Sequence, residues 1–129
     1  MRAIRSKDTK PEIIVRRLAH RMGYRFRLHR KDLPGKPDMV FPGRRGVIFI
    51  HGCFWHQHPD PACRHARPPK SNTDYWQSKL ARNQVRDAEH KTALQAQGWR
   101  VLVIWECQTK DEMVLKNLLL SFLDFSPRQ

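Results

Sequence analysis

The chain has 129 residues, a length typical of one domain large enough to bury its own hydrophobic core. No stretch approaches the apolar length of a membrane span, and the basic N-terminus lacks the apolar core of a signal peptide, so we expect a cytoplasmic protein. Three cysteines are an odd number, which argues against a disulfide framework and favours metal binding or free thiols.

The positive charge is unevenly distributed along the chain. Lys and Arg number 25 against 12 acidic residues, which gives a net charge of +13. Residues 1–45 contain 14 basic and 4 acidic side chains and so carry +10 of that charge. Such a one-sided basic field is typical of proteins that bind a polyanion, most often nucleic acid. A merely soluble basic surface is the alternative, since composition alone is a weak sign of specificity.

The first predicted element is a helix. Thr9 is suited to be its N-cap, Pro11 lies in its first turn, and Glu12 occupies the capping-box position. The helix should run to about Met22, with Gly23 closing it. Its apolar face contains Ile14, Leu18 and Met22. Its other face is basic and contains Arg16, Arg17, His20 and Arg21. Like charges four residues apart slightly destabilise a helix, so we expect this face to meet phosphate.

Apolar runs and turn residues predict the remaining elements. We expect strands over 24–29, 38–41 and 46–51, an irregular loop over 59–72, a long helix over 74–97, a buried strand over 100–105 and a last helix over about 111–123. A second capping box, from Thr109 to Glu112, should open the last helix, which we assign to packing. The order α-β-β-β-α-β-α indicates one α/β domain over 1–129, with a single mixed sheet flanked by helices.

The segment 51–58, which reads HGCFWHQH, is the most informative stretch of the chain. It follows the apolar run 47–50 and contains three histidines, a thiol and two aromatic rings in eight residues. Functional groups are often mounted where strands end, and imidazole and thiolate are preferred ligands of zinc. Core packing does not require this mixture, so the segment predicts a functional site.

The cysteines predict a structural zinc site. If the strands 46–51 and 100–105 are neighbours, Cys107 can meet the loop that carries Cys53, His58 and Cys63, and these four residues make a Cys₃His set. His65 is an alternative to Cys63 as the fourth ligand. Zinc would hold a long loop in place, because its binding free energy adds to the folding free energy. Three unrelated buried thiols are the competing interpretation.

Asp38 follows Pro37 at the start of a strand, twelve residues before the end of the next one. This resembles the two-strand metal site of restriction-endonuclease-like nucleases, which usually combines Pro-Asp with a later acid-x-Lys. Here Phe49, Ile50 and His51 stand where the acid and the lysine would be. For Asp38 alone, a turn or cap aspartate is the preferred interpretation.

Taken together, the motifs resemble the very-short-patch repair (Vsr) mismatch endonucleases. The matching segments are residues 1–9, Pro37-Asp38, VIFIHGCFWHQH over 47–58, Tyr75-Trp76, Lys79 with Asn83, and GWRVLVIWEC over 98–107. The resemblance covers residues 1–110. It implies a restriction-endonuclease core that nicks one strand of duplex DNA 5′ to the T of a T:G mismatch, such as arises when 5-methylcytosine is deaminated.

The resemblance also implies catalytic roles. Asp38 and the backbone carbonyl of Ile50 would bind Mg²⁺, and the carbonyl does not depend on the side chain, although the family often has Thr here. His51 and His56 would lie at the scissile phosphate, with His56 as the base and His51 positioning the phosphate or stabilising the transition state. Glu12 matches an active-site acid of the family, whereas its capping-box position gives a purely structural reason for glutamate.

The DNA contacts follow in the same way. Phe54 and Trp55 would wedge into the base stack beside the mismatch, and Met1 would enter from the minor-groove side. Residues matching the family's readers of the mispaired bases are Lys79 and Asn83, with Trp76 one turn earlier. Core aromatics and a solvated helix face are the structural alternatives. Two features depart from the family: the N-terminal arm, which is either short here or was trimmed, and the proline-containing insertion before Cys63.

The expected partner is double-stranded DNA with a T:G mismatch, bound by a monomer in the nucleoid-containing cytoplasm. Two competing functions remain: a nuclease of the same fold with another specificity, and a non-catalytic zinc module that binds DNA. The presence of Asp38 together with His51 and His56 argues against the second, because binding alone requires none of them.

Overall fold

The computed structural model describes residues 9–28, 30–53 and 71–124. Its helices and strands are α1 (Lys10–Arg21), β1 (Arg27–Leu28), β2 (Met39–Phe41), β3 (Gly46–His51), α2 (Thr73–Ala96), β4 (Arg100–Trp105) and α3 (Glu112–Leu123). This order confirms the predicted succession of elements. Within the described ranges, no helix is long and apolar enough to span a bilayer.

One four-stranded sheet has the order β1-β2-β3-β4. The pairs β1–β2 and β2–β3 are antiparallel, and β3–β4 is parallel with His51 opposite Trp105. The single mixed sheet is therefore confirmed. So is the expectation that the two apolar strands are neighbours, which brings their carboxyl ends to one edge of the sheet.

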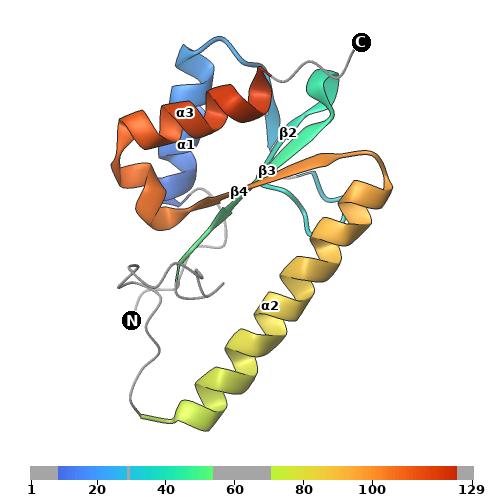
Figure 1. Ribbon diagram of the computed structural model, residues 1–129, viewed down its shortest axis with the longest axis vertical. Helices are drawn as coiled ribbons and strands as arrows, with labels where there is room; N and C mark the ends of the chain where they lie inside the picture. The colour runs from blue at the N-terminus through green and yellow to red at the C-terminus, as the bar shows by residue number, and fades with distance from the viewer. Residues whose placement is uncertain (1–8, 29, 54–70, 125–129) are drawn as a thin grey trace.

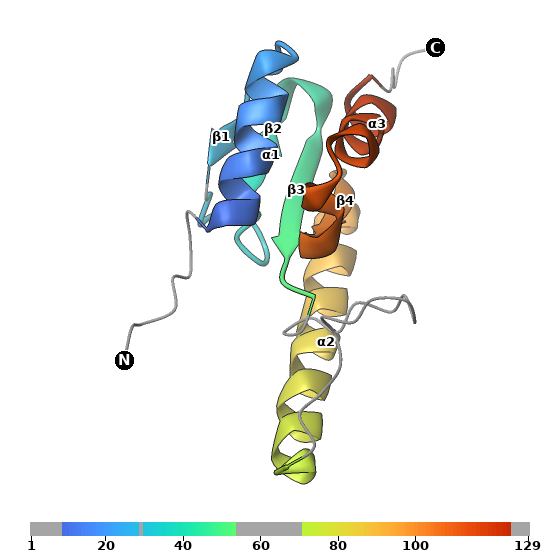
Figure 2. The same ribbon diagram turned by 90° about the vertical axis from the view of Figure 1, so that its left-hand side faces the viewer.

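Helices cover both faces of the sheet (Figures 1 and 2): α1 and α3 lie on one face, and α2 lies on the other. One buried cluster joins α1 and α3 to the sheet through Val15, Leu18, Met39, Phe41, Ile48, Ile104, Leu115, Leu119 and Leu123. The second joins α2 to the opposite face through Leu33, Val40, Val47, Leu94 and Trp99. Burial on both faces explains why β3 reads as a continuous apolar run. The expectation that the strand 100–105 is fully buried is wrong, because β4 lies at the edge of the sheet and only Ile104 of its residues is buried. The packing role expected for α3 is confirmed.

Much of α2 does not pack on the sheet. Leu94, near its C-terminal end, is fully buried, whereas Tyr75 and Val85 are 59% and 58% exposed. Figures 1 and 2 show the N-terminal half of α2 extending beyond the carboxyl ends of β3 and β4. The helix therefore presents this half for contact with something outside the sheet.

Both predicted capping boxes are wrong. Thr9 is the N-cap of α1, but its side chain makes no capping hydrogen bond, and Glu12 is buried instead of reaching back to Thr9. Thr109 lies in a 3-10 helix (Glu106–Lys110), where its hydroxyl donates to the carbonyl of Glu106 at 2.7 Å. Asp111 caps α3, because its carboxylate accepts from the backbone N–H groups of the two residues at 113 and 114.

The strand predicted over 24–29 is mostly absent from the described residues. Only Arg27–Leu28 pairs with β2, at an exposed edge. Tyr24 instead closes α1, since its N–H donates to Ala19 and its hydroxyl donates to Asp124 at 2.6 Å. Alternating hydrophobicity cannot distinguish such a helix-closing segment from a strand.

The overall arrangement is compatible with a restriction-endonuclease core.

Candidate active site

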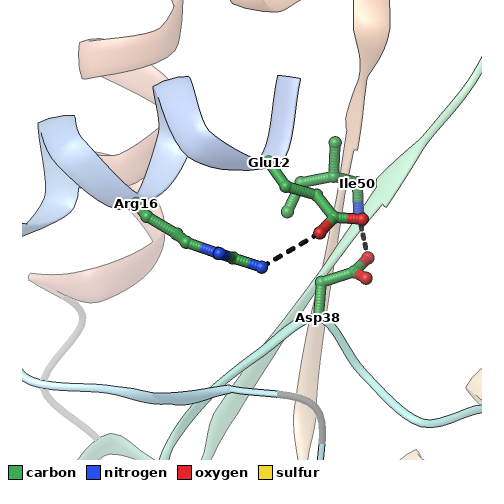
Figure 3. A network of polar contacts seen from close by, with 4 residues as sticks. All are labelled: Glu12, Arg16, Asp38 and Ile50. Atoms are coloured by element: carbon green, nitrogen blue, oxygen red, sulfur yellow. Dashed lines mark hydrogen bonds and ion pairs between the residues drawn. The ribbon is translucent and has the colours of Figure 1, made fainter. Parts of the chain in front are cut away.

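The structure brings Glu12, Asp38 and Ile50 together at the carboxyl end of β3 (Figure 3). Glu12 comes from the first turn of α1, Asp38 directly precedes β2, and Ile50 is the penultimate residue of β3. The backbone N–H of Asp38 donates to the carbonyl of Ile48 at 3.0 Å, and the N–H of Ile50 donates to Oδ2 of Asp38 at 2.7 Å. These two bonds fix the Asp38 carboxyl group against β3.

Glu12 lies beside Asp38 and is only 4% exposed. Its Oε1 accepts a hydrogen bond from Nη2 of Arg16, one helical turn later, at 3.0 Å. Figure 3 shows the Glu12 carboxyl group between Arg16 and Asp38. The structure therefore contradicts the interpretation of Glu12 as part of a capping box. Its carboxyl group lies at the candidate site instead.

The surroundings of the Asp38 carboxyl group change its pKa strongly. The pKa of Asp38 is raised from 3.8 to about 7, mainly by burial and to a smaller extent by the charge of Glu12 and a hydrogen bond to its carboxyl group, while the Ile50 N–H and the charge of Arg16 act in the opposite direction. The Asp38 carboxyl group therefore loses its proton less readily than an exposed aspartate does. A hard divalent cation suits this donor set, because it prefers carboxylate oxygen and compensates both charges.

His51 ends β3 and is 8% exposed. Its ring centroid lies 5.2 Å from that of Trp105 and 5.7 Å from that of Phe49. Because side chains alternate along a strand, His51 lies on the α2 face of the sheet, opposite the Ile50 side chain. There it lines a cavity of about 240 Å³ between the sheet and α2, whose wall includes His90 and Lys91. Its partner imidazole, His56, lies outside the described residues.

The predicted zinc ligands are only partly described. Cys53 is fully buried just after β3, and Cys107 is half-buried just after β4. The parallel pairing of these strands places both thiols past the same edge of the sheet. His58, Cys63 and His65 lie outside the described residues. Among residues 9–28, 30–53 and 71–124, no three His, Cys, Asp or Glu side chains are grouped to hold a metal ion, so the zinc site stays a prediction.

Trp76, Lys79 and Asn83 lie at helical spacing on α2, in the half that extends beyond the sheet, and each is partly exposed. The Asn83 carbonyl accepts a hydrogen bond from Nη2 of Arg86 at 2.6 Å, and the Trp76 ring lies 5.1 Å from that of Tyr75. This placement allows contact with a ligand at the catalytic edge. The predicted DNA contacts Met1, Phe54 and Trp55 lie outside the described residues.

Arg16 is the residue of the site that sequence reasoning missed. In the sequence, Arg16 belongs with Arg17 and Arg21 to the basic helix face that is expected to meet phosphate. The structure instead directs it inward to Glu12, with its side chain 16% exposed. The available signal was the Glu-to-Arg spacing of four residues, which places the two side chains on one helix face.

Known proteins are similar to most of the chain. The family described as DNA mismatch endonuclease Vsr matches residues 1–62. The type II nicking enzyme V.XorIIP of Xanthomonas oryzae pv. oryzae is 54% identical over 124 residues, which cover 96% of this chain and 89% of that protein. The type II nicking enzyme V.NmeAIP of Neisseria meningitidis is 42% identical over 119 residues, covering 92% and 83%.

The DNA mismatch endonuclease Vsr of Escherichia coli is 43% identical over 107 residues, which cover 83% of this chain and 67% of that protein. Nucleases of this kind act on DNA and are generally metal-dependent, in keeping with the carboxylate pair beside β3. With such identity across most of both chains, the protein belongs to the Vsr family and is a DNA endonuclease.

Proposed function

We propose that this endonuclease nicks duplex DNA 5′ to the T of a T:G mismatch by Mg²⁺-dependent hydrolysis, and so starts the repair of deaminated 5-methylcytosine on cytoplasmic DNA. The buried Glu12–Asp38 pair at the end of β3 carries the proposal. Two of the relatives named above are nicking enzymes and one is a mismatch endonuclease. Those names favour strand nicking over cutting of both strands.

Asp38 and the Ile50 carbonyl are the proposed Mg²⁺ ligands. In a strand, the N–H and C=O of one residue point to the same side, and the Ile50 N–H donates to Asp38. The Ile50 carbonyl therefore faces the side of Asp38, beyond the first β2–β3 pair, Met39 with Ile48. Bound Mg²⁺ would stabilise the charge that develops at the scissile phosphate. Glu12 would bind water next to Asp38.

The proton transfers are assigned to the imidazoles. We propose that neutral His56 accepts the proton of the attacking water, and that His51 positions the phosphate or stabilises the transition state. His51 is mounted on β3 directly after Ile50, is 8% exposed and contacts the rings of Phe49 and Trp105. A side chain enclosed in this way keeps one orientation, which a phosphate-positioning group requires.

Recognition of the mismatch is assigned to α2 and to the segment after β3. Lys79 and Asn83 would read the mispaired bases with Trp76 nearby, while Phe54, Trp55 and Met1 would open the base stack. Cys53 and Cys107, with His58 and either Cys63 or His65, would bind a structural Zn²⁺ that fixes this segment. We propose that the enzyme acts as a monomer.

The test is a comparison of substrates. End-labelled duplexes that contain T:G, another mismatch or no mismatch are incubated with the zinc-loaded protein and Mg²⁺, and the products are mapped on both strands. A single nick 5′ to the T, in the T:G duplex only, is the expected result. Equal cutting of all duplexes would instead indicate a nuclease of the same fold with another specificity. An intact protein that binds the duplexes and cuts none would be a non-catalytic DNA-binding module.

A further inference from the structure

Arg16 differs from the other basic residues of α1. Lys10, Arg17 and His20 are exposed, and Arg21 is 63% exposed with its guanidinium 3.6 Å from Glu112. The Arg16 side chain is 16% exposed and donates to Glu12, whose own side chain is 6% exposed. A charged group that is so enclosed has a structural or chemical role, because removing it from water is costly.

The contact between Arg16 and Glu12 has a directional effect. Exposed ion pairs contribute little, but a charge-assisted hydrogen bond in an enclosed site restricts the orientation of a carboxylate. Oε1 of Glu12 accepts from Arg16, and the carboxyl group lies between Arg16 and Asp38 (Figure 3). With Arg16 absent, the three rotatable bonds of the Glu12 side chain could turn it away from Asp38.

Arg16 also acts on Asp38 through its charge. The Arg16 guanidinium lies against the Glu12 carboxyl group, which lies next to Asp38 (Figure 3). The guanidinium therefore reduces the repulsion that would otherwise separate the two carboxylates. The same residue thus favours both the orientation of Glu12 and its closeness to Asp38.

We propose that Arg16 is a positioning residue that holds the Glu12 carboxylate where it acts together with Asp38 on a divalent cation. The proposal rests on the proposed function in one respect, the presence of a cation at this carboxylate pair. A pure counter-charge at the same place would have the opposite effect on cation affinity. A positive charge alone weakens cation binding, whereas a positioned carboxylate strengthens it, so the sign of the change separates the two roles.

The experiment measures Mn²⁺ binding to the full-length, zinc-loaded protein without DNA, from the electron paramagnetic resonance signal of free Mn²⁺. The variants are Arg16→Met, which keeps the apolar stem, Arg16→Lys, Glu12→Gln and the double variant Glu12→Gln/Arg16→Met. Arg17→Met is the matched control, because it removes the same charge from the exposed neighbouring position. Thermal melting of every variant checks that it is folded.

Arg16→Met should weaken Mn²⁺ binding about tenfold, the usual effect of removing a residue that orients a metal ligand. Glu12→Gln should weaken it at least as much, and the double variant should bind no more weakly than Glu12→Gln, because Arg16 acts through Glu12. Arg16→Lys should retain most of the affinity, since a lysine four residues after a glutamate can still pair with it. The Arg17 variant should match the parent protein.

Tighter Mn²⁺ binding by Arg16→Met would overturn the proposal in favour of a counter-charge. Unchanged binding, a further loss in the double variant, or a parent protein that does not bind Mn²⁺ would overturn it as well. If Arg16→Met does not fold, the double variant replaces it, because no buried charge is then left unpaired. Its affinity should equal that of Glu12→Gln, and a weaker affinity would contradict the proposal.

The titration also separates this inference from the proposed function, because it contains no DNA. If the Mn²⁺ affinities of the parent protein and its variants follow the expected order but the parent does not nick T:G duplexes, the role of Arg16 is supported and the proposed reaction is rejected. If the parent protein nicks T:G duplexes but Arg16→Met leaves the Mn²⁺ affinity unchanged, the proposed reaction is supported and the proposed role of Arg16 is rejected.

Discussion

Asp38 shows how a single residue can be stabilised by the backbone and destabilised by its surroundings. The Ile50 N–H donates to its carboxylate, yet burial and the nearby Glu12 raise its pKa to about 7. Such a conflict between fold stability and site chemistry is common where a cation is to bind. In the proposed reaction, a bound cation would compensate the charge of the Asp38 carboxylate and so remove this cost.

This conflict predicts a pH-dependent cost. Below pH 3.8 both the folded and the unfolded chain keep the Asp38 proton; between 3.8 and about 7 only the folded chain keeps it. The free energy of unfolding therefore falls as the pH rises through this window, by up to about 1.4 kcal/mol for each pH unit. Asp38→Asn keeps an oxygen acceptor for the Ile50 N–H and removes the cost.

Without added Mg²⁺, Asp38→Asn should melt at a higher temperature than the parent protein at pH 8, and the gap should close as the pH is lowered towards 4. Addition of Mg²⁺ at pH 8 should raise the melting temperature of the parent and leave that of the variant unchanged. Calorimetry across this pH range measures both effects. A gap that stays constant with pH would contradict the raised pKa of Asp38.

At the scale of the elements, the parallel pair β3–β4 organises the site. Each strand ends beside the other, and the residues that follow include Cys53 and Cys107. Because Cys53 is fully buried and the predicted ligands come from well-separated segments, zinc would join the end of β4 to the segment after β3. A structural zinc therefore predicts both the metal content of the purified protein and its thermal stability.

The purified protein should contain one Zn²⁺ per chain by metal analysis, and Cys107→Ala should lose it. Chelation should lower the melting temperature by several degrees, because the binding free energy of zinc is part of the folding free energy. Re-addition of Zn²⁺ should restore the original curve. An undisturbed melting curve after complete removal of the metal would reject the structural zinc.

The second element-scale prediction concerns α2. Lys79→Ala and Asn83→Ala should each reduce the preference for T:G over matched duplexes by about 1–3 kcal/mol, because each would remove one of the proposed base contacts. Arg82→Ala, an exposed cation of the same helix, is the matched control and should weaken binding to both duplexes equally. Fluorescence anisotropy with both duplexes measures the difference. If Lys79→Ala weakens binding to both duplexes equally, Lys79 does not contribute to recognition of the mismatch.

At the scale of the whole molecule, the two faces of the sheet carry different groups of the candidate site, and both sets lie near the carboxyl end of β3. The face under α1 and α3 carries the Glu12–Asp38 pair, and the face under α2 carries His51. The projecting half of α2 lies beyond the same edge (Figures 1 and 2). A duplex bound there could contact both sets of groups at once.

The sequence predicted most of this arrangement because its strongest signals are local. The bounds of β3 and β4 follow from apolar runs that end at glycine or at polar residues, and Asp38 follows from Pro37. The inward turn of Glu12 was not predictable from local rules, since a capping box and a buried ion pair use the same glutamate. Similarly, Asp111 and Thr109 are both good caps, and packing of Leu115 and Leu119 decides between them.

The most direct test of the account is single-turnover nicking of a T:G duplex by the parent protein and by Asp38→Asn, at saturating Mg²⁺, with the DNA affinity measured on the same samples. The parent should nick once, 5′ to the T. Because the proposed metal-assisted hydrolysis uses the Asp38 carboxylate as a ligand, the variant should nick at least about 10³-fold more slowly while it binds the duplex with nearly the same affinity. A variant that nicks at the parent rate would contradict the assignment of the Glu12–Asp38 pair as the metal site.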